Sequence, residues 1–216
     1  MTLRALLLAD GPSDLPLAMH LEALCADHGR EVQVTPIDPR RLGLDGRTVE
    51  DRLRIVLAQD VEPDFVFIHR DAEAQSPDDR IAEVKRGATA AGISVETVVP
   101  VVPVRMTEAW LLLDEMEIRR VSGRPSSTNA LGLPSAGQAE NIADPKALLR
   151  KALLKAGDPS GKRRRRQFER DFGRHRALLL QRLDPRGPVT KLSAWQRLDA
   201  DVQSVLDAEP EQSEGL

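Results

Sequence analysis

Two short stretches decide the fold: residues 3–14, LRALLLADGPSD, and residues 65–73, FVFIHRDAE. In each of them a short apolar run ends at a polar turn, which is typical of a strand buried on both faces of a sheet. A helical pattern follows the first stretch over residues 12–28, where Leu17, Leu21 and Leu24 fall on one face. Buried strands that alternate with helices predict a mainly parallel α/β sheet flanked by helices.

The alternation continues outward from these two stretches. We expect further strands at residues 31–37 and 95–104, and helices at 48–60, 78–91 and 107–122. Gly92 is expected to end the helix before it, and Thr107 to cap the helix that follows it. Pro100 and Pro103 indicate that the last strand lies at an edge or carries a bulge. In such sheets, ligands bind beyond the carboxyl ends of the strands.

The remainder of the chain predicts a different organisation. Residues 1–122 form the expected α/β domain, residues 123–143 form a loop rich in Pro, Ser, Gly and Asn, and residues 144–208 form a basic helical region packed on the domain. Helices are expected at residues 146–156, 160–183 and 194–208, the first of them opened by Asp144 and Pro145. The polar, acidic tail at residues 209–216 is expected to be disordered.

Composition narrows the class of protein. The 216 residues are 41% hydrophobic, which is ordinary for a globular protein with a core. The single cysteine, Cys25, excludes a disulfide within the chain and a cysteine-based metal site, so we expect a reducing cytoplasm. The start of the chain is expected to lack a signal peptide, and no segment has the roughly 20 apolar residues needed to cross a membrane.

Acidic residues follow the two deciding strands. Asp10 comes directly after the first apolar run, and Asp71 and Glu73 come directly after the second. If the two strands are parallel neighbours, these carboxylates meet at one edge of the sheet and repel each other unless a cation lies between them. Mg²⁺, or Mn²⁺ in its place, suits such a site, because Mg²⁺ binds one or two carboxylates together with waters and phosphate oxygens.

Each of these residues also has a structural interpretation. Residues 10–14 are a good turn and helix start, with Ser13 as a cap and Asp14 favouring the helix dipole. Asp71 and Glu73 can be solvated loop charges, and His69 can be a structural histidine. Glu108 follows the fourth expected strand, where it is either a first-turn residue that helps to cap a helix or a further metal or substrate carboxylate.

These residues resemble the motifs of Toprim domains. Residues 10–14, DGPSD, resemble the first Toprim motif, and residues 71–73, DAE, resemble the second, Asp-x-Asp. Residues 101–114, VVPVRMTEAWLLLD, and residues 144–149, DPKALL, are similar to a bacterial Toprim-like family of unknown function. The sequence departs from the usual Toprim pattern in having Asp at position 10 rather than Glu, and Glu at position 73 rather than a second Asp.

The resemblance implies a Mg²⁺-dependent nuclease that hydrolyses phosphodiesters of DNA or RNA, with Asp10, Asp71 and Glu73 as metal ligands and Glu108 as a further ligand or base. Related nucleases lie beside ATPases in phage-defence loci, which implies an antiviral effector with an ATPase partner. The alternative is a catalytically degenerate Toprim-like subunit that binds or regulates an ATPase complex. A topoisomerase-type reaction needs a tyrosine nucleophile, and the chain contains no tyrosine. A nucleotide-binding protein ranks last, because neither a Walker motif nor a G-x-G-x-x-G pattern is present.

A basic segment is the second functional candidate. Residues 145–186 contain 14 basic and 4 acidic residues, including the unbroken run Lys162-Arg163-Arg164-Arg165-Arg166, which Arg170, Arg174 and Arg176 continue. Nucleic-acid phosphates are the expected partner, although a solvated face or a contact with the acidic tail is the alternative. Phe168 and Phe172 are interpreted as core anchors. Trp110, Trp195 and the leucine-rich helices leave room for a homodimer.

Overall fold

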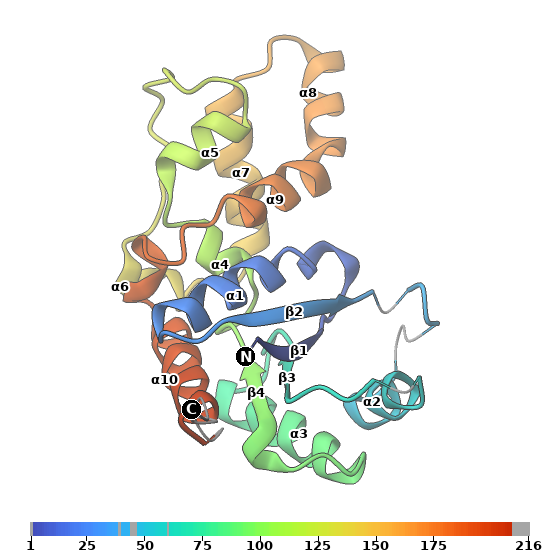
Figure 1. Ribbon diagram of the computed structural model, residues 1–216. Helices are drawn as coiled ribbons and strands as arrows, with labels where there is room; N and C mark the ends of the chain where they lie inside the picture. The colour runs from blue at the N-terminus through green and yellow to red at the C-terminus, as the bar shows by residue number, and fades with distance from the viewer. Residues whose placement is uncertain (1, 39, 44–46, 60, 209–216) are drawn as a thin grey trace.

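The computed structural model describes residues 2–38, 40–43, 47–59 and 61–208. Four parallel strands form one sheet in the order β2-β1-β3-β4 (Figure 1). The strands are β1 (Leu3–Leu8), β2 (Val32–Ile37), β3 (Phe65–His69) and β4 (Val98–Val101). The predicted parallel α/β sheet is therefore confirmed, and β1 and β3 are direct neighbours whose carboxyl ends share one edge of the sheet.

Helices cover both faces of the sheet because successive strand residues point to opposite sides. Leu7 and Phe67 belong to one buried cluster, and Leu6 and Ile68 belong to the other. The second cluster also contains the apolar faces of α2 (Val49–Leu57) and α3 (Pro77–Ala90). The first, larger cluster contains those of α1 (Leu17–Asp27) and α10 (Ser193–Ala208).

The fourth strand is shorter than predicted. A turn of 3-10 helix, η2 (Val95–Thr97), takes up its expected beginning, and the strand ends at Val101. Pro100 and Pro103 cannot donate backbone hydrogen bonds, which suits a strand that pairs with β3 alone. The expected edge position of this strand is confirmed.

The expected helix at residues 107–122 consists of two short helices, α4 (Glu108–Leu111) and α5 (Glu115–Val121). A second helix starts because the Asp114 carboxylate accepts a hydrogen bond from the backbone N–H of Glu117 at 2.9 Å. The expected loop at 123–143 contains the single turn α6 (Ala136–Ala139), and α7 (Pro145–Gly157) begins with the predicted Asp144 cap.

The expected helix at 160–183 is also two helices, α8 (Lys162–Arg170) and α9 (Phe172–Gln181). No residue of α8 is buried, whereas Phe172, Leu179 and Leu180 of α9 lie in the core, and the chain changes direction at Asp171 between them. Figure 1 shows α8 at the end of the helical half that lies away from the sheet. The interpretation of Phe168 and Phe172 as anchors is confirmed, since Phe172 is buried and Phe168 packs against the same cluster.

One core cluster joins the sheet to the C-terminal helices. Trp110 of α4 and Trp195 of α10 are 1% and 2% exposed and pack edge to face with ring centroids 5.1 Å apart. Both rings are buried against each other within one chain, so the interface of the expected homodimer would involve other residues. Across the described residues, none of the helices combines the length and apolar character needed to cross a membrane. The acidic tail at 209–216 lies outside the described residues.

Candidate active site

The carboxyl edge of the sheet gathers the predicted site residues from neighbouring strands. Asp10 follows β1, and Asp71 and Glu73 follow β3. Backbone hydrogen bonds extend the pairing of β3 and β4 beyond the strands: Arg70 N–H donates to Val101 O at 3.2 Å, and Glu73 N–H donates to Arg105 O at 2.7 Å. The loop that carries Asp71 and Glu73 is thus fixed to the connection that follows β4.

His69 is the centre of this site. Its imidazole is fully buried, with Nδ1 3.4 Å from the backbone N–H of Asp10 and Nε2 3.0 Å from Thr107 Oγ1. The Asp10 N–H donates to Nδ1, so the neutral ring carries its proton on Nε2, where it faces Thr107 and Asp71. Burial acts to lower the pKa of His69, but the Asp71 hydrogen bond and the charges of Asp14, Asp71 and Asp10 outweigh it and raise that pKa.

Asp71 is held by several donors. Its Oδ1 accepts hydrogen bonds from Thr107 N–H at 3.0 Å and from the Thr107 hydroxyl at 3.1 Å, and lies 3.6 Å from His69 Nε2. Burial acts to raise the pKa of Asp71, but the His69 and Thr107 contacts outweigh it and keep the pKa below its usual range. The carboxylate is ionised and anchored, so the interpretation of Asp71 as a solvated loop charge is wrong.

The same contacts correct the prediction for Thr107. This hydroxyl makes no capping hydrogen bond to the helix that follows it, because it donates to Asp71. Its position between Asp71 and His69 makes it part of the site, which the sequence pattern did not indicate.

Asp10 faces two arginines. Its Oδ1 lies 3.5 Å from Arg52 Nη1 of α2 and 3.3 Å from Arg70 Nε, which directly follows β3. The carboxylate is about one-third exposed, whereas Arg52 is buried. Asp10 therefore lies where solvent and a ligand can reach it, beside fixed positive charge.

Glu73 lies at the exposed rim of the site in a strained conformation. Its φ is 53°, and that of Arg105 is 72°. Both are non-glycine residues in the left-handed region, where side chains are strained, and such strain gathers at functional sites. The Arg105 guanidinium donates to Glu73 O at 3.1 Å, and Arg80 Nη2 lies 4.0 Å from the Glu73 carboxylate.

A buried ion-pair network joins the site to α9. Arg176 donates from Nε to Glu108 Oε1 at 2.9 Å and from Nη2 to Asp14 Oδ1 at 2.7 Å. Burial acts to lower the pKa of Arg176, but the charges and hydrogen bonds of Asp14 and Glu108 outweigh it and raise that pKa. The Glu108 Oε2 atom is buried without a hydrogen-bond partner.

This network adds to one sequence interpretation and corrects two. Asp14 does lie in the 3-10 turn Pro12–Asp14, but it is buried there as a partner of Arg176, and Glu108 pairs with Arg176 rather than capping α4. Arg176 does not continue the solvent-facing basic run, because it is buried on α9. It is 162 residues from Asp14 in the sequence, and no local pattern links two such distant positions.

The described residues contain no group of three or more His, Cys, Asp or Glu side chains placed to hold a metal ion. The expected set Asp10, Asp71 and Glu73 is thus not assembled as a three-residue site within the part of the chain that the structure describes. Mg²⁺ fits a smaller set, because it commonly takes one or two carboxylates and completes its shell with waters and substrate phosphates. Asp10 and Asp71 are the residues that suit this role, since the described contacts of Asp71 all fall on Oδ1.

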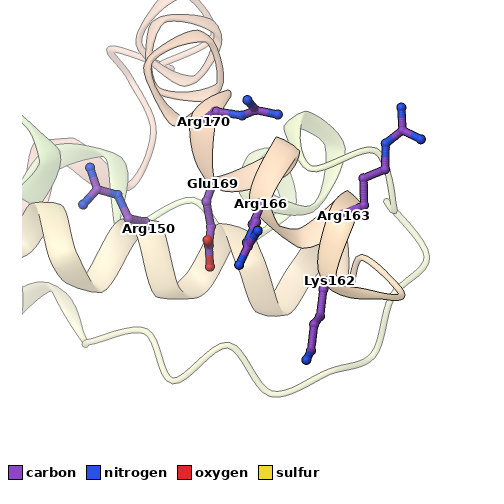
Figure 2. Close-up of a pocket in the computed structure, with 6 residues that line it drawn as sticks. All are labelled: Arg150, Lys162, Arg163, Arg166, Glu169 and Arg170. Atoms are coloured by element: carbon purple, nitrogen blue, oxygen red, sulfur yellow. The ribbon is translucent and has the colours of Figure 1, made fainter.

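The basic segment forms a separate candidate surface on α8. Lys162 to Arg166 and Arg170 are all exposed. Lys162, Arg163, Arg166, Glu169 and Arg170 line a cavity of about 840 Å³ together with Arg150 of α7 (Figure 2). The sequence indicated the run of cations but not the contribution of Arg150 or Glu169.

The fold and the site together define an α/β protein with an acidic and arginine-rich site at the carboxyl edge of a parallel sheet. Comparison of the chain with protein-family models, with curated proteins and with solved structures finds no match.

Proposed function

We propose that the protein is a divalent-metal-dependent nuclease that hydrolyses phosphodiesters at the carboxyl edge of its sheet. The observation that carries this proposal is the placement of Asp10 and Asp71 at the ends of the neighbouring strands β1 and β3, with His69 in contact with both residues. The resemblance to Toprim nucleases supports the same chemistry. It extends the proposal to an antiviral effector that acts with an ATPase.

Each residue of the site has a distinct part in the proposed reaction. Asp10 and Asp71 would hold Mg²⁺, which when bound polarises the phosphodiester and activates water. Arg70, beside Asp10, would contact a substrate phosphate, because its guanidinium matches phosphate geometry. His69 and Thr107 are positioning residues that fix the Asp71 carboxylate. We assign Glu108 to holding Arg176 rather than to the metal.

The test is cleavage of labelled single- and double-stranded DNA and RNA with Mg²⁺ or Mn²⁺. Wild type should cleave at least one substrate in a metal-dependent reaction. Asp71→Asn should lose at least the roughly 10–100-fold that removal of a hydrogen-bond partner of a metal ligand costs. Glu96→Gln is the matched control, since Glu96 is an exposed acid at the amino end of β4, away from the site. Equal cleavage by Asp71→Asn and wild type would reject the assignment of the site.

A second candidate function is a Toprim-like binding or regulatory subunit without catalysis. The observation that favours it is the pairing of Asp10 with Arg52 and Arg70, and of Glu108 with Arg176, because an arginine can occupy the place of a cation. This candidate predicts no cleavage by wild type, even with a neighbouring ATPase supplied, together with salt-sensitive nucleic-acid binding that survives removal of divalent metal.

A further inference from the structure

The cavity on α8 is a groove with a definite charge pattern. Its six lining residues comprise five cations and one acid, with Arg150 on α7 and the others on α8. Lys162, Arg166 and Glu169 recur at helical spacing, and Figure 2 shows them extending in the same direction from α8, whereas Arg163 and Arg170 extend to other sides. A ligand in this groove would therefore meet both positive charge and a carboxylate on one face of the helix.

The two helices that border the groove are fixed by aromatic contacts. The Arg150 guanidinium carbon lies 4.4 Å from the centroid of the Phe172 ring, and a buried aromatic partner of this kind orients the cation. The Phe168 ring lies 4.5 Å from that of His175 and against Gly157, where a Cβ would come within 2.6 Å of the ring. The glycine thus allows α8 to pack closely against the end of α7.

Glu169 sets a requirement on the ligand. A carboxylate repels phosphate, so a ligand that offers only phosphates gains no affinity from Glu169. A ligand that also carries a hydrogen-bond donor beside its phosphates gains affinity by donating to this carboxylate. Within the protein, Glu169 Oε1 lies 3.3 Å from Arg165 Nε, and both side chains are largely exposed. Exposed ion pairs contribute little stability, so the Glu169 carboxylate can exchange this contact for a donor on a ligand.

The size of the groove suits a short stretch of nucleic acid. A volume of about 840 Å³ lies in the range that encloses a small-molecule ligand, roughly 300–1,000 Å³. One strand of a few nucleotides fills a space of this volume. Unpaired bases expose donor groups on their Watson–Crick edges, which pairing occupies in a duplex.

We propose that the groove lined by α7 and α8 binds single-stranded nucleic acid in preference to duplex. Arg150, Lys162 and Arg166 contact backbone phosphates, and Glu169 accepts a hydrogen bond from the Watson–Crick edge of an unpaired base. This inference rests on the proposed function only in taking nucleic acid as the ligand, and it requires no catalysis.

The experiment measures binding of fluorescent single-stranded and duplex oligonucleotides of the same sequence, as DNA and as RNA, in EDTA over a series of salt concentrations. Wild type should bind the single strand more tightly. Glu169→Gln should reduce the ratio of single-strand to duplex affinity by about tenfold, the effect of losing one hydrogen bond to a charged group. Arg150→Gln should weaken single-strand binding and lower its salt slope by about 0.7, the value for one lost phosphate contact.

Lys191→Gln is the matched control, because Lys191 is an exposed cation on the turn Pro188–Lys191, outside the groove. Equal or tighter duplex binding by wild type, or no binding to any of the oligonucleotides, would overturn the proposal. So would Arg150→Gln and Glu169→Gln variants that keep their thermal stability and bind like Lys191→Gln. Cleavage is scored separately, so single-strand preference without cleavage contradicts only the nuclease proposal, and cleavage without that preference contradicts only this one.

Discussion

The Asp71 carboxylate shows how single residues shape the strand-end site. It lies at the end of an apolar strand, where an isolated charge would be costly to bury. Thr107 supplies two hydrogen bonds to Oδ1 from the next strand connection, and His69 lies beneath the same oxygen. These donors stabilise the ionised form and fix its direction, which is the state in which a carboxylate can bind a metal.

A pH-dependent stability follows from this arrangement. The folded-state pKa of Asp71 is below the ordinary value of 3.8, so its contribution to folding is present above that pH and is lost as the pH falls through the folded pKa. Asp71→Asn should lower the free energy of unfolding at neutral pH by about 1–3 kcal/mol, because Thr107 and His69 lose an ionised acceptor. Urea unfolding of both proteins from neutral to acidic pH measures the difference.

The difference between wild type and Asp71→Asn should narrow below pH 3.8, where Asp71 becomes protonated in the wild type as well. Glu31→Gln, which changes an exposed acid just before the amino end of β2, controls for the general loss of one negative charge. A difference that stays constant over the whole pH range would show that Asp71 acts through its shape rather than its charge.

At the scale of elements, α9 is tied to the sheet by charge as well as by apolar packing. Arg176 of α9 bridges Asp14, in the 3-10 turn Pro12–Asp14 after β1, and Glu108, in α4 after β4. One helix of the C-terminal half therefore holds the connections that follow two different strands. A helix outside the sheet therefore holds in place two of the segments at the carboxyl edge, where the candidate site lies.

Arg176→Met tests this tie. Removal of one partner from a buried ion-pair network leaves the opposite charges uncompensated, and we expect a loss of about 3–5 kcal/mol in the free energy of unfolding. Arg174→Gln, an exposed cation on the same helix, should change it by less than about 0.5 kcal/mol. Chemical denaturation of the two variants provides the measurement, and similar losses in both would contradict a specific role for the buried network.

The elements also show what the sequence could predict. The apolar runs at residues 3–9 and 65–69 indicated two buried strands and, through them, the edge where Asp10 and Asp71 lie. Local signals predicted the Asp144 helix start correctly. The break at Asp171 follows from where α9 packs, which no local pattern indicates, whereas the break at Asp114 has a local signal, the Asp114 cap on Glu117, that the helical pattern obscures. Arg176 and Thr107 were missed because their partners are distant in the chain.

At the scale of the whole molecule, the sheet and the C-terminal helices share one core. The larger apolar cluster contains residues of β1, β3 and β4 together with residues of α7, α9 and α10. The contact between Trp110 and Trp195 lies inside that cluster. Neither part can bury its apolar surface without the other, so the boundary at residue 122 separates segments of sequence rather than two cores.

This shared core predicts that the protein unfolds as one cooperative unit. Fluorescence of Trp110 and Trp195, which reports the join between the sheet and the helices, should change at the same denaturant concentration as the helical circular dichroism. Cys25 provides a third probe, because it is fully buried in α1 and burial raises the pKa of its thiol to about 12. A thiol in this state reacts slowly with alkylating reagents until it is exposed.

Cys25 labelling, tryptophan fluorescence and circular dichroism should therefore give coincident midpoints in urea. An early fluorescence change with Cys25 still protected would mean that the helical half separates first and that the sheet persists alone. That result would contradict the shared core. It would also mean that the ion pairs of Arg176 do not hold the helical half to the sheet.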